Sequence, residues 1–202
     1  MPDPYVLAFL LVVGTALLVL YSRLIAAIQG SVASYRGLYS TQEMLGNNYL
    51  CDSVRMIFLL LLPFYALTLV VSGVSSLGFF MTLALLVLLW LFCKMASMML
   101  GWLSSRQGAM RSVEITGYAV SIIAMLVSLA ACIIGWLVPA VPHKLLAGFL
   151  AVVAAIGFFV YSRRSFSLIL STGFSPFFWV LYLCALNFLP ICVAVNILIN
   201  GN

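Results

Sequence analysis

Residues 79–103 have the sequence FFMTLALLVLLWLFCKMASMMLGWL, in which Lys94 is the single charged side chain. An α-helix needs about 20 consecutive, mostly apolar residues to cross the hydrocarbon core of a bilayer. This stretch meets that requirement, so it predicts a membrane-spanning helix. Repetition of such runs along the chain would make the protein a bundle of membrane-spanning helices.

Five further stretches have a similar length and apolar character. They are Val6–Ala27, Arg55–Gly73, Thr116–Val138, Lys144–Ser162 and Phe177–Ile199. Across all 202 residues, 66% are hydrophobic and only 6% are charged, whereas a soluble domain typically has about 25% charged residues. This composition excludes a soluble globular protein, a disordered chain and a nucleic-acid binder. We predict an all-α, polytopic transmembrane helical bundle of about six spans with short loops, forming a single integral membrane domain over residues 1–202.

The basic residues alternate between the two sides of this predicted bundle. One side has seven of them: Arg23, Arg36, Arg55, Arg106, Arg111, Arg163 and Arg164. The other side has Lys144 alone, and cytoplasmic loops are the ones that carry an excess of Lys and Arg. The pattern therefore predicts that both termini lie outside. The first apolar stretch lacks a basic segment before it and is longer than the apolar region of a signal peptide, so we expect it to be a retained helix.

The predicted connections differ in length. Ser72–Gly78 and Pro139–His143 are short, so the helices on either side of each should be antiparallel neighbours. Gly30–Ser53 and Ser165–Phe174 are longer and have apolar residues at helical spacing, including Val32 and Tyr35 in the first. These two segments are either short helices on the inner membrane interface or ordered loops.

Lys94 is the one ionisable residue well inside a predicted span, about nine residues before its cytoplasmic end. An ionisable residue at bilayer depth is a candidate functional residue by default. Lys94, Ser97 and Gly101 recur at i, i+3 and i+7, which places them on one helix face. We predict that the ammonium group faces protein or a water pocket; the alternative is a lysine that extends to the inner headgroups.

The fourth predicted span has small residues at alternating spacings of four and three. These residues are Gly117, Ser121, Ala124, Ser128, Ala131 and Gly135. Small side chains allow two membrane helices to approach closely, and hydroxyl groups can add interhelical hydrogen bonds. The pattern predicts a helix-packing seam, which Gly148, Ala151 and Ala155 of the next span could face.

The last predicted span contains Tyr182, Asn187, Pro190 and Asn196. Pro190 cannot donate a hydrogen bond to the carbonyl of Leu186, so we expect a kink or widened turn there. An unsatisfied carbonyl is costly in lipid, and the Asn187 amide is placed to answer it. Asn187 is then either a helix-packing residue or part of an ion, lipid or partner contact.

Residues for catalysis or metal binding are few and scattered. The chain has one histidine, His143, and five cysteines without a Cys-x-x-Cys pair, which argues against a zinc site and a disulfide framework. Its four acidic residues are Asp3, Glu43, Asp52 and Glu114, and none was expected well inside a span. We predict no catalytic residues, no metal and no cofactor, and hence a protein that is not an enzyme.

The C-terminal stretch carries a family resemblance. The pairs Arg163-Arg164 and Phe177-Phe178, the run Leu181–Leu186 (LYLCAL) and Leu189-Pro190 resemble the ending of a family of multi-pass membrane proteins of unknown function, found mainly in Bacteroidota. The resemblance implies a Gram-negative inner membrane and no specific activity. In that family the position of Asn187 is often acidic, whereas here it is neutral.

Two functional interpretations follow. The first is a non-enzymatic accessory or scaffold subunit of an inner-membrane assembly, with a membrane-protein partner or a second copy of itself. The second is a small transporter or channel, acting as one copy or as an oligomer, that uses Lys94 or the break at Pro190. Neither involves nucleic acid.

Overall fold

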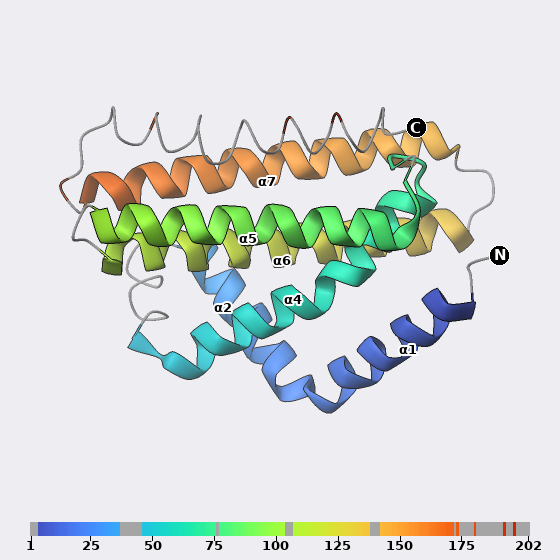
Figure 1. The fold of residues 1–202 in the computed structure, drawn as a ribbon, viewed down its shortest axis with the longest axis horizontal. Coiled ribbons are helices and arrows are strands. Elements are labelled where there is room, and N and C mark those ends of the chain that lie inside the picture. Colours follow the sequence, from blue (N-terminus) through green and yellow to red (C-terminus); the bar gives the residue numbers. More distant parts are fainter. Residues whose placement is uncertain are drawn as a thin grey trace.

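The computed structural model describes residues 4–36, 46–75, 77–103, 107–137 and 142–171, with residues 173, 180, 192 and 196 in addition. Six α-helices lie in this part of the chain (Figure 1). Their bounds are α1 Pro4–Val19, α2 Tyr21–Arg36, α4 Asn48–Val71, α5 Phe79–Leu103, α6 Gln107–Leu137 and α7 His143–Ser171. The predicted all-α fold class is confirmed.

Four of these helices, α4 to α7, are long and apolar enough to cross a membrane, and the pair α1–α2 adds a fifth span if it is counted as one broken helix. The architecture is that of a multi-pass membrane protein. The sixth predicted span, Phe177–Ile199, lies outside the described residues apart from isolated positions.

Helix α4 begins and ends with well-formed caps. The side chain of Asn47 accepts hydrogen bonds from the backbone N–H groups of Tyr49 and Leu50, at 3.1 and 3.4 Å. At the other end Gly73 has φ +72°, a left-handed conformation that glycine adopts without strain. The N–H of Val74 then donates to the carbonyl of Leu69 at 3.1 Å, and that of Gly73 to Val70 at 3.1 Å. This Schellman motif turns the chain directly into α5.

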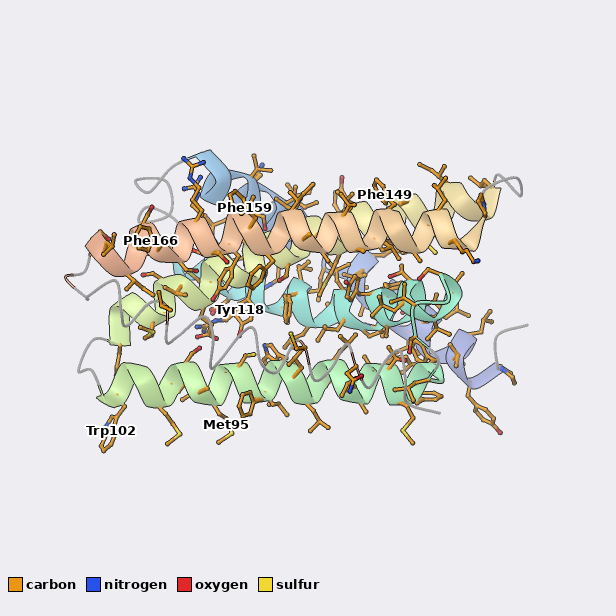
Figure 2. The ribbon with its side chains drawn as sticks, turned by 90° about the horizontal axis from the view of Figure 1, so that it is seen from above. Met95, Trp102, Tyr118, Phe149, Phe159 and Phe166 are labelled. Carbon is orange, nitrogen blue, oxygen red and sulfur yellow. The ribbon has the colours of Figure 1, made fainter. Side chains whose placement is uncertain are left out.

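Helices α4 and α6 form the centre of the bundle, and α5 and α7 lie on opposite sides of them (Figure 2). Half of the residues in the spanning part of α4 are buried, against 11% in α5 and 11% in α7. The core is made by buried side chains of α2, α4 and α6: Ala27, Cys51, Val54, Ile57, Phe58, Leu61, Leu62, Ile115, Tyr118, Ile122 and Met125. The central position of α4 and α6 means that a polar group on either helix must find its partner within the protein.

The chain runs back and forth along the long axis of the bundle (Figure 1). The end of α2, the start of α4, the end of α5, the start of α6 and the end of α7 lie at one end, which is called the arginine end below because Arg55, Arg111 and Arg163 lie in the helix segments there. The start of α1, the end of α4, the start of α5, the end of α6 and the start of α7 lie at the other. The two short connections therefore join antiparallel neighbours, as the sequence predicted.

The first predicted span differs from expectation. Instead of one helix over Val6–Ala27, the chain forms α1 and α2 with a bend of 79° between them at Leu20. Apolar length alone cannot show a bend, because the residues on both sides of the break are hydrophobic. The change of direction brings Ala26 and Ala27 of α2 into buried positions.

Several predicted boundaries are also wrong, because a helix need not begin or end where its apolar run does. Helix α6 begins at Gln107, nine residues before the predicted start at Thr116. Helix α7 continues to Ser171, so Ser165–Ser171 is neither a separate interfacial helix nor a loop. Likewise α2 continues to Arg36, and residues 37–45 lie outside the described part.

Candidate functional site

A chain of polar side chains connects α4, α5 and α6. The hydroxyl of Tyr118 donates a hydrogen bond to Oε1 of Glu114 at 2.6 Å and accepts one from Nε1–H of Trp90 at 3.1 Å. Oε2 of Glu114 lies 4.0 Å from Nη2 of Arg55. Nζ of Lys94 lies over the ring of Trp90, 5.1 Å from its centroid. These five residues are called the polar cluster below.

Helical spacing within α5 and α6 builds most of this arrangement. Glu114 and Tyr118 are four residues apart on α6, and Trp90 and Lys94 are four residues apart on α5, so each pair shares a face. Side chains in a helix incline toward its N-terminus, which directs Lys94 back over Trp90. The sequence predicts that the C-terminal end of α5 is cytoplasmic, so the Lys94 side chain extends away from the cytoplasmic side.

The cluster is partly shielded from its surroundings. The side chain of Glu114 is 13% exposed and that of Arg55 is 33% exposed. Tyr118 is buried, and its ring packs on that of Phe58 with 4.8 Å between centroids. Nε of Arg55 is buried and has no hydrogen-bond partner. The contact between Arg55 and Glu114 is at the outer limit of an ion pair, so the hydrogen bond from Trp90 of α5 to Tyr118 of α6 is the shortest link between helices in the cluster.

Ser97 and Gly101, which the sequence places on one helix face with Lys94, make contacts of their own. Ser97 is buried, and its hydroxyl donates to the carbonyl of Cys93 on the same helix at 2.8 Å. Gly101 is buried against the start of α6. A Cβ atom at position 101 would lie 3.4 Å from Cβ of Met110. The partner of Lys94 is instead the aromatic ring of Trp90, through a cation–π contact.

The small residues of α6 lie along its contact with α7. A Cβ atom at Gly117 would lie 3.2 Å from Cε2 of Tyr161, and one at Gly135 would lie 3.6 Å from Cδ2 of Leu146. Between them, Cβ of Ala124 lies 3.7 Å from the position that a Cβ of Gly157 would take. Small residues of α6 thus face two large side chains of α7 and one glycine.

The predicted partner face on α7 is wrong. Gly148, Ala151 and Ala155 are exposed, and nothing lies within 4 Å of a Cβ placed at Gly148. Helix α7 is rotated so that Leu146, Leu150 and Gly157 face α6 instead. Beside Gly135, shape complementarity explains this choice, because the Leu146 side chain fills the space that a glycine leaves open. The seam also has fewer interhelical hydrogen bonds than expected, since the hydroxyl of Ser128 donates to Ala124 on its own helix at 2.7 Å.

Tyr182, Asn187 and Pro190 lie outside the described residues, so the expected kink in the last span stays a prediction. Within the described part of the chain, His, Cys, Asp and Glu side chains form no group of three or more that would suit a metal ion.

No protein-family model, curated protein or solved structure matches this chain. Function is therefore inferred from the chain's own residues.

Sequence reasoning missed four members of the polar cluster: Arg55, Trp90, Glu114 and Tyr118. Arg55 and Glu114 were expected at the ends of spans, because the second and fourth spans were predicted to begin at Arg55 and Thr116. Two features of the sequence could have indicated these residues. Asn47 is a good N-cap residue just before α4, and an earlier start would have placed Arg55 two turns inside the helix. The pairing of Glu114 with Tyr118 at i, i+4 was a second signal.

Proposed function

We propose that this chain is a non-enzymatic subunit, an accessory or scaffold protein, of an assembly in a bacterial inner membrane. Both termini would lie on the periplasmic side, as the basic residues predict, and the resemblance of the C-terminal stretch supports the same membrane. The partner would be another membrane protein or a second copy of this chain.

The observation that carries this proposal is the outer face of α5. Its side chains form one stripe that points away from the bundle, and Figure 2 shows Met95 and Trp102 on it. The stripe consists of Met81, Leu88, Phe92, Met95, Met99 and Trp102, each at least half exposed. By contrast, the polar groups of the cluster on α4, α5 and α6 are used inside the bundle to join these helices.

Methionine content separates this stripe from an ordinary lipid-facing surface. Three of the six residues of the stripe, Met81, Met95 and Met99, are methionines. Methionine is unbranched and polarizable, so it adapts to irregular surfaces and is common where a protein binds partners. The exposed face of α7 is equally apolar, with Phe149, Val152, Ile156 and Phe159, but it has no methionine among these residues.

This difference gives a matched pair of positions for a test. A photo-reactive phenylalanine analogue is introduced at Met95, which is 64% exposed on α5, or at Val152, which is 55% exposed on α7. Cells that contain either variant are irradiated, and the adducts are identified by mass spectrometry.

A specific protein adduct at Met95, with mainly lipid adducts at Val152, is the expected result. An adduct between two copies of the chain would identify the partner as a second copy. Lipid adducts alone at both positions would contradict a subunit function.

The alternative is a small transporter or channel, acting as one copy or as an oligomer. It is favoured by the polar cluster, because ionisable residues in spanning helices commonly mark ion or proton pathways, and by the broken helix pair α1–α2, since discontinuous helices form many transport sites. Purified protein in liposomes should then conduct protons or alkali cations, and Glu114→Gln should abolish the flux. Absence of flux in the unmodified protein for all these ions would remove this alternative.

A further inference from the structure

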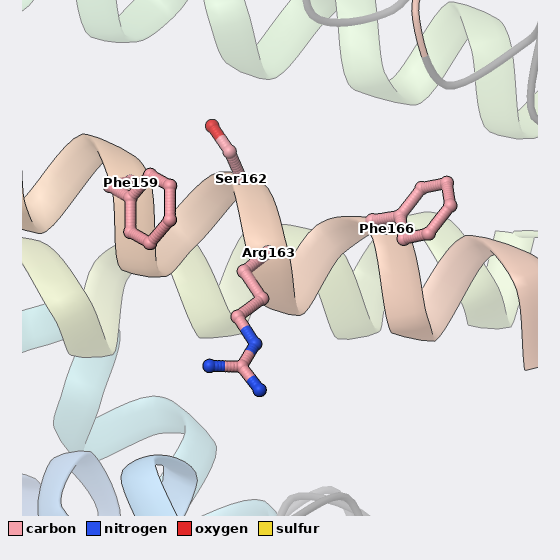
Figure 3. A pocket seen from close by; sticks show the side chains of 4 residues that line it. All are labelled: Phe159, Ser162, Arg163 and Phe166. Carbon is pink, nitrogen blue, oxygen red and sulfur yellow. The ribbon is translucent and has the colours of Figure 1, made fainter.

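A shallow depression of about 200 Å³ lies on the outer face of α7 and is lined by Phe159, Ser162, Arg163 and Phe166. Phe159, Arg163 and Phe166 follow one another at i, i+4 and i+7, so they lie along one side of the helix. Figure 3 shows the Arg163 side chain between the two rings, with Ser162 leaving the helix in another direction. Phe159 is 69% exposed, so this surface is open to the surroundings.

The depth of the depression follows from the length of α7. Arg163 comes 19 residues after Lys144, which corresponds to about 28 Å along a helix. The hydrocarbon core of a bilayer is about 30 Å thick. With Lys144 at one boundary of the core, Arg163 lies at the opposite boundary, where lipid phosphates begin.

Neighbouring helices support the same depth. The contact between Gly117 and Tyr161 sets α6 and α7 in antiparallel register, and this register places Arg163 close to the level of Glu114. Arg55 lies at that level too, because it contacts Glu114. The charged residues of three helices thus form one layer at the arginine end.

The charge of Arg163 is not neutralised within the described part of the chain. Its side chain is exposed, and the one ion pair between described residues joins Arg55 to Glu114. A guanidinium group binds phosphate oxygens through two parallel hydrogen bonds. The leaflet on the cytoplasmic side is the one with a negative surface potential, and the positive-inside pattern assigns the arginine end to that side.

We propose that this depression binds an anionic phospholipid of the inner leaflet. The acyl chain lies against Phe159 on the hydrocarbon side, the lipid phosphate lies on the Arg163 guanidinium, and Phe166 lies beside the headgroup beyond the phosphate. This site is independent of α5 and of the subunit function proposed above.

The test compares phosphatidylglycerol and phosphatidylcholine with identical acyl chains. Each lipid is added to the full-length protein in detergent, and the bound lipid molecules are counted by native mass spectrometry. The unmodified protein should retain phosphatidylglycerol in preference to phosphatidylcholine. Arg163→Gln should lower the affinity for phosphatidylglycerol about fivefold, the contribution expected of one basic residue at a membrane surface, and leave phosphatidylcholine unchanged. Phe159→Ala should weaken both lipids, while Arg163→Lys should keep the preference.

Lys144→Gln is the matched control, because Lys144 is also an exposed basic residue but lies at the other end of α7. Circular dichroism and gel filtration establish that each variant remains folded. The proposal is overturned if Arg163→Gln keeps the preference for phosphatidylglycerol, or if Lys144→Gln loses it equally. Displacement of the lipid by inorganic phosphate at millimolar concentration would also overturn it, since the acyl chain would then be dispensable.

Discussion

Removal of the Tyr118 hydroxyl is the most direct test of the polar cluster. Tyr118→Phe keeps the ring and its packing on Phe58, but it removes both hydrogen bonds that the hydroxyl makes. Nε1–H of Trp90 loses its acceptor and Glu114 loses its donor. The bond with Trp90 joins α5 to α6, and the bond with Glu114, within α6, orders that carboxylate near Arg55. We therefore expect the helices to be held together less strongly.

The expected loss in the free energy of unfolding can be worked out from the two hydrogen bonds. A hydrogen bond to a charged acceptor contributes about 1.5–3 kcal/mol and a neutral one about 1 kcal/mol. Hydrogen bonds between helices in membranes often contribute less, about 0.6 kcal/mol each, since the separated helices find other partners. The free energy of unfolding should therefore fall by about 2 kcal/mol, toward the lower part of the range that the two bonds allow.

The assay is reversible unfolding in mixed micelles with increasing dodecyl sulfate, followed by far-UV circular dichroism. Tyr65→Phe is the matched control, because Tyr65 lies on α4 and the structure gives its hydroxyl no hydrogen bond. A double-mutant cycle with Trp90→Phe then isolates the link between α5 and α6. A loss below about 0.5 kcal/mol, the size of an ordinary surface substitution, or a loss equal to that of Tyr65→Phe, would refute the cluster as a tie between helices.

Three further predictions use matched positions. Gly117→Leu should destabilise the α6–α7 contact by about 1–3 kcal/mol through overpacking, whereas Gly148→Leu, which has open space around it, should leave the midpoint of the same unfolding titration unchanged; equal effects would contradict the described seam. In a chain without other cysteines, Gly78→Cys should react with an impermeant maleimide in intact spheroplasts and Gly46→Cys only after permeabilisation; the reverse order would overturn the assigned orientation. Lys94→Arg should keep the cation–π contact and the unfolding midpoint, whereas Lys94→Leu should lower the midpoint because the cation–π contact is lost. An unchanged midpoint in both variants would show that the ammonium group does not stabilise the bundle.

The spans could be predicted wherever an uninterrupted apolar run met a clear break. The run over residues 79–103 coincides with α5 because Gly78 precedes it and polar residues follow it. The starts of α4 and α6 were predicted too late for one physical reason. Hydropathy marks where the hydrocarbon core begins, but backbone hydrogen bonds continue a helix beyond that point, and charged residues such as Glu114 tolerate helical conformation well.

The candidate site could be predicted only in part. Lys94 was found because one charge in an apolar run is conspicuous. Its partner was not found, since a freed carbonyl or a polar group of a neighbouring span was expected, whereas the direction of helical side chains favours Trp90 one turn earlier on the same helix. Tyr118 escaped notice because a tyrosine in a span is ordinary until its hydroxyl is seen between two other polar groups.

Composition and apolar run length by themselves determined that this protein is a helical membrane bundle, and charge placement predicted its orientation. These properties depend on transfer of side chains between water and lipid, which each segment undergoes largely on its own. Tertiary structure alone decided the 79° bend at Leu20, the rotation of α7 and the meeting of Arg55, Trp90 and Glu114 around Tyr118. Such features depend on shape and hydrogen-bond geometry between helices distant in sequence, and in lipid no hydrophobic pattern distinguishes one apolar helix face from another.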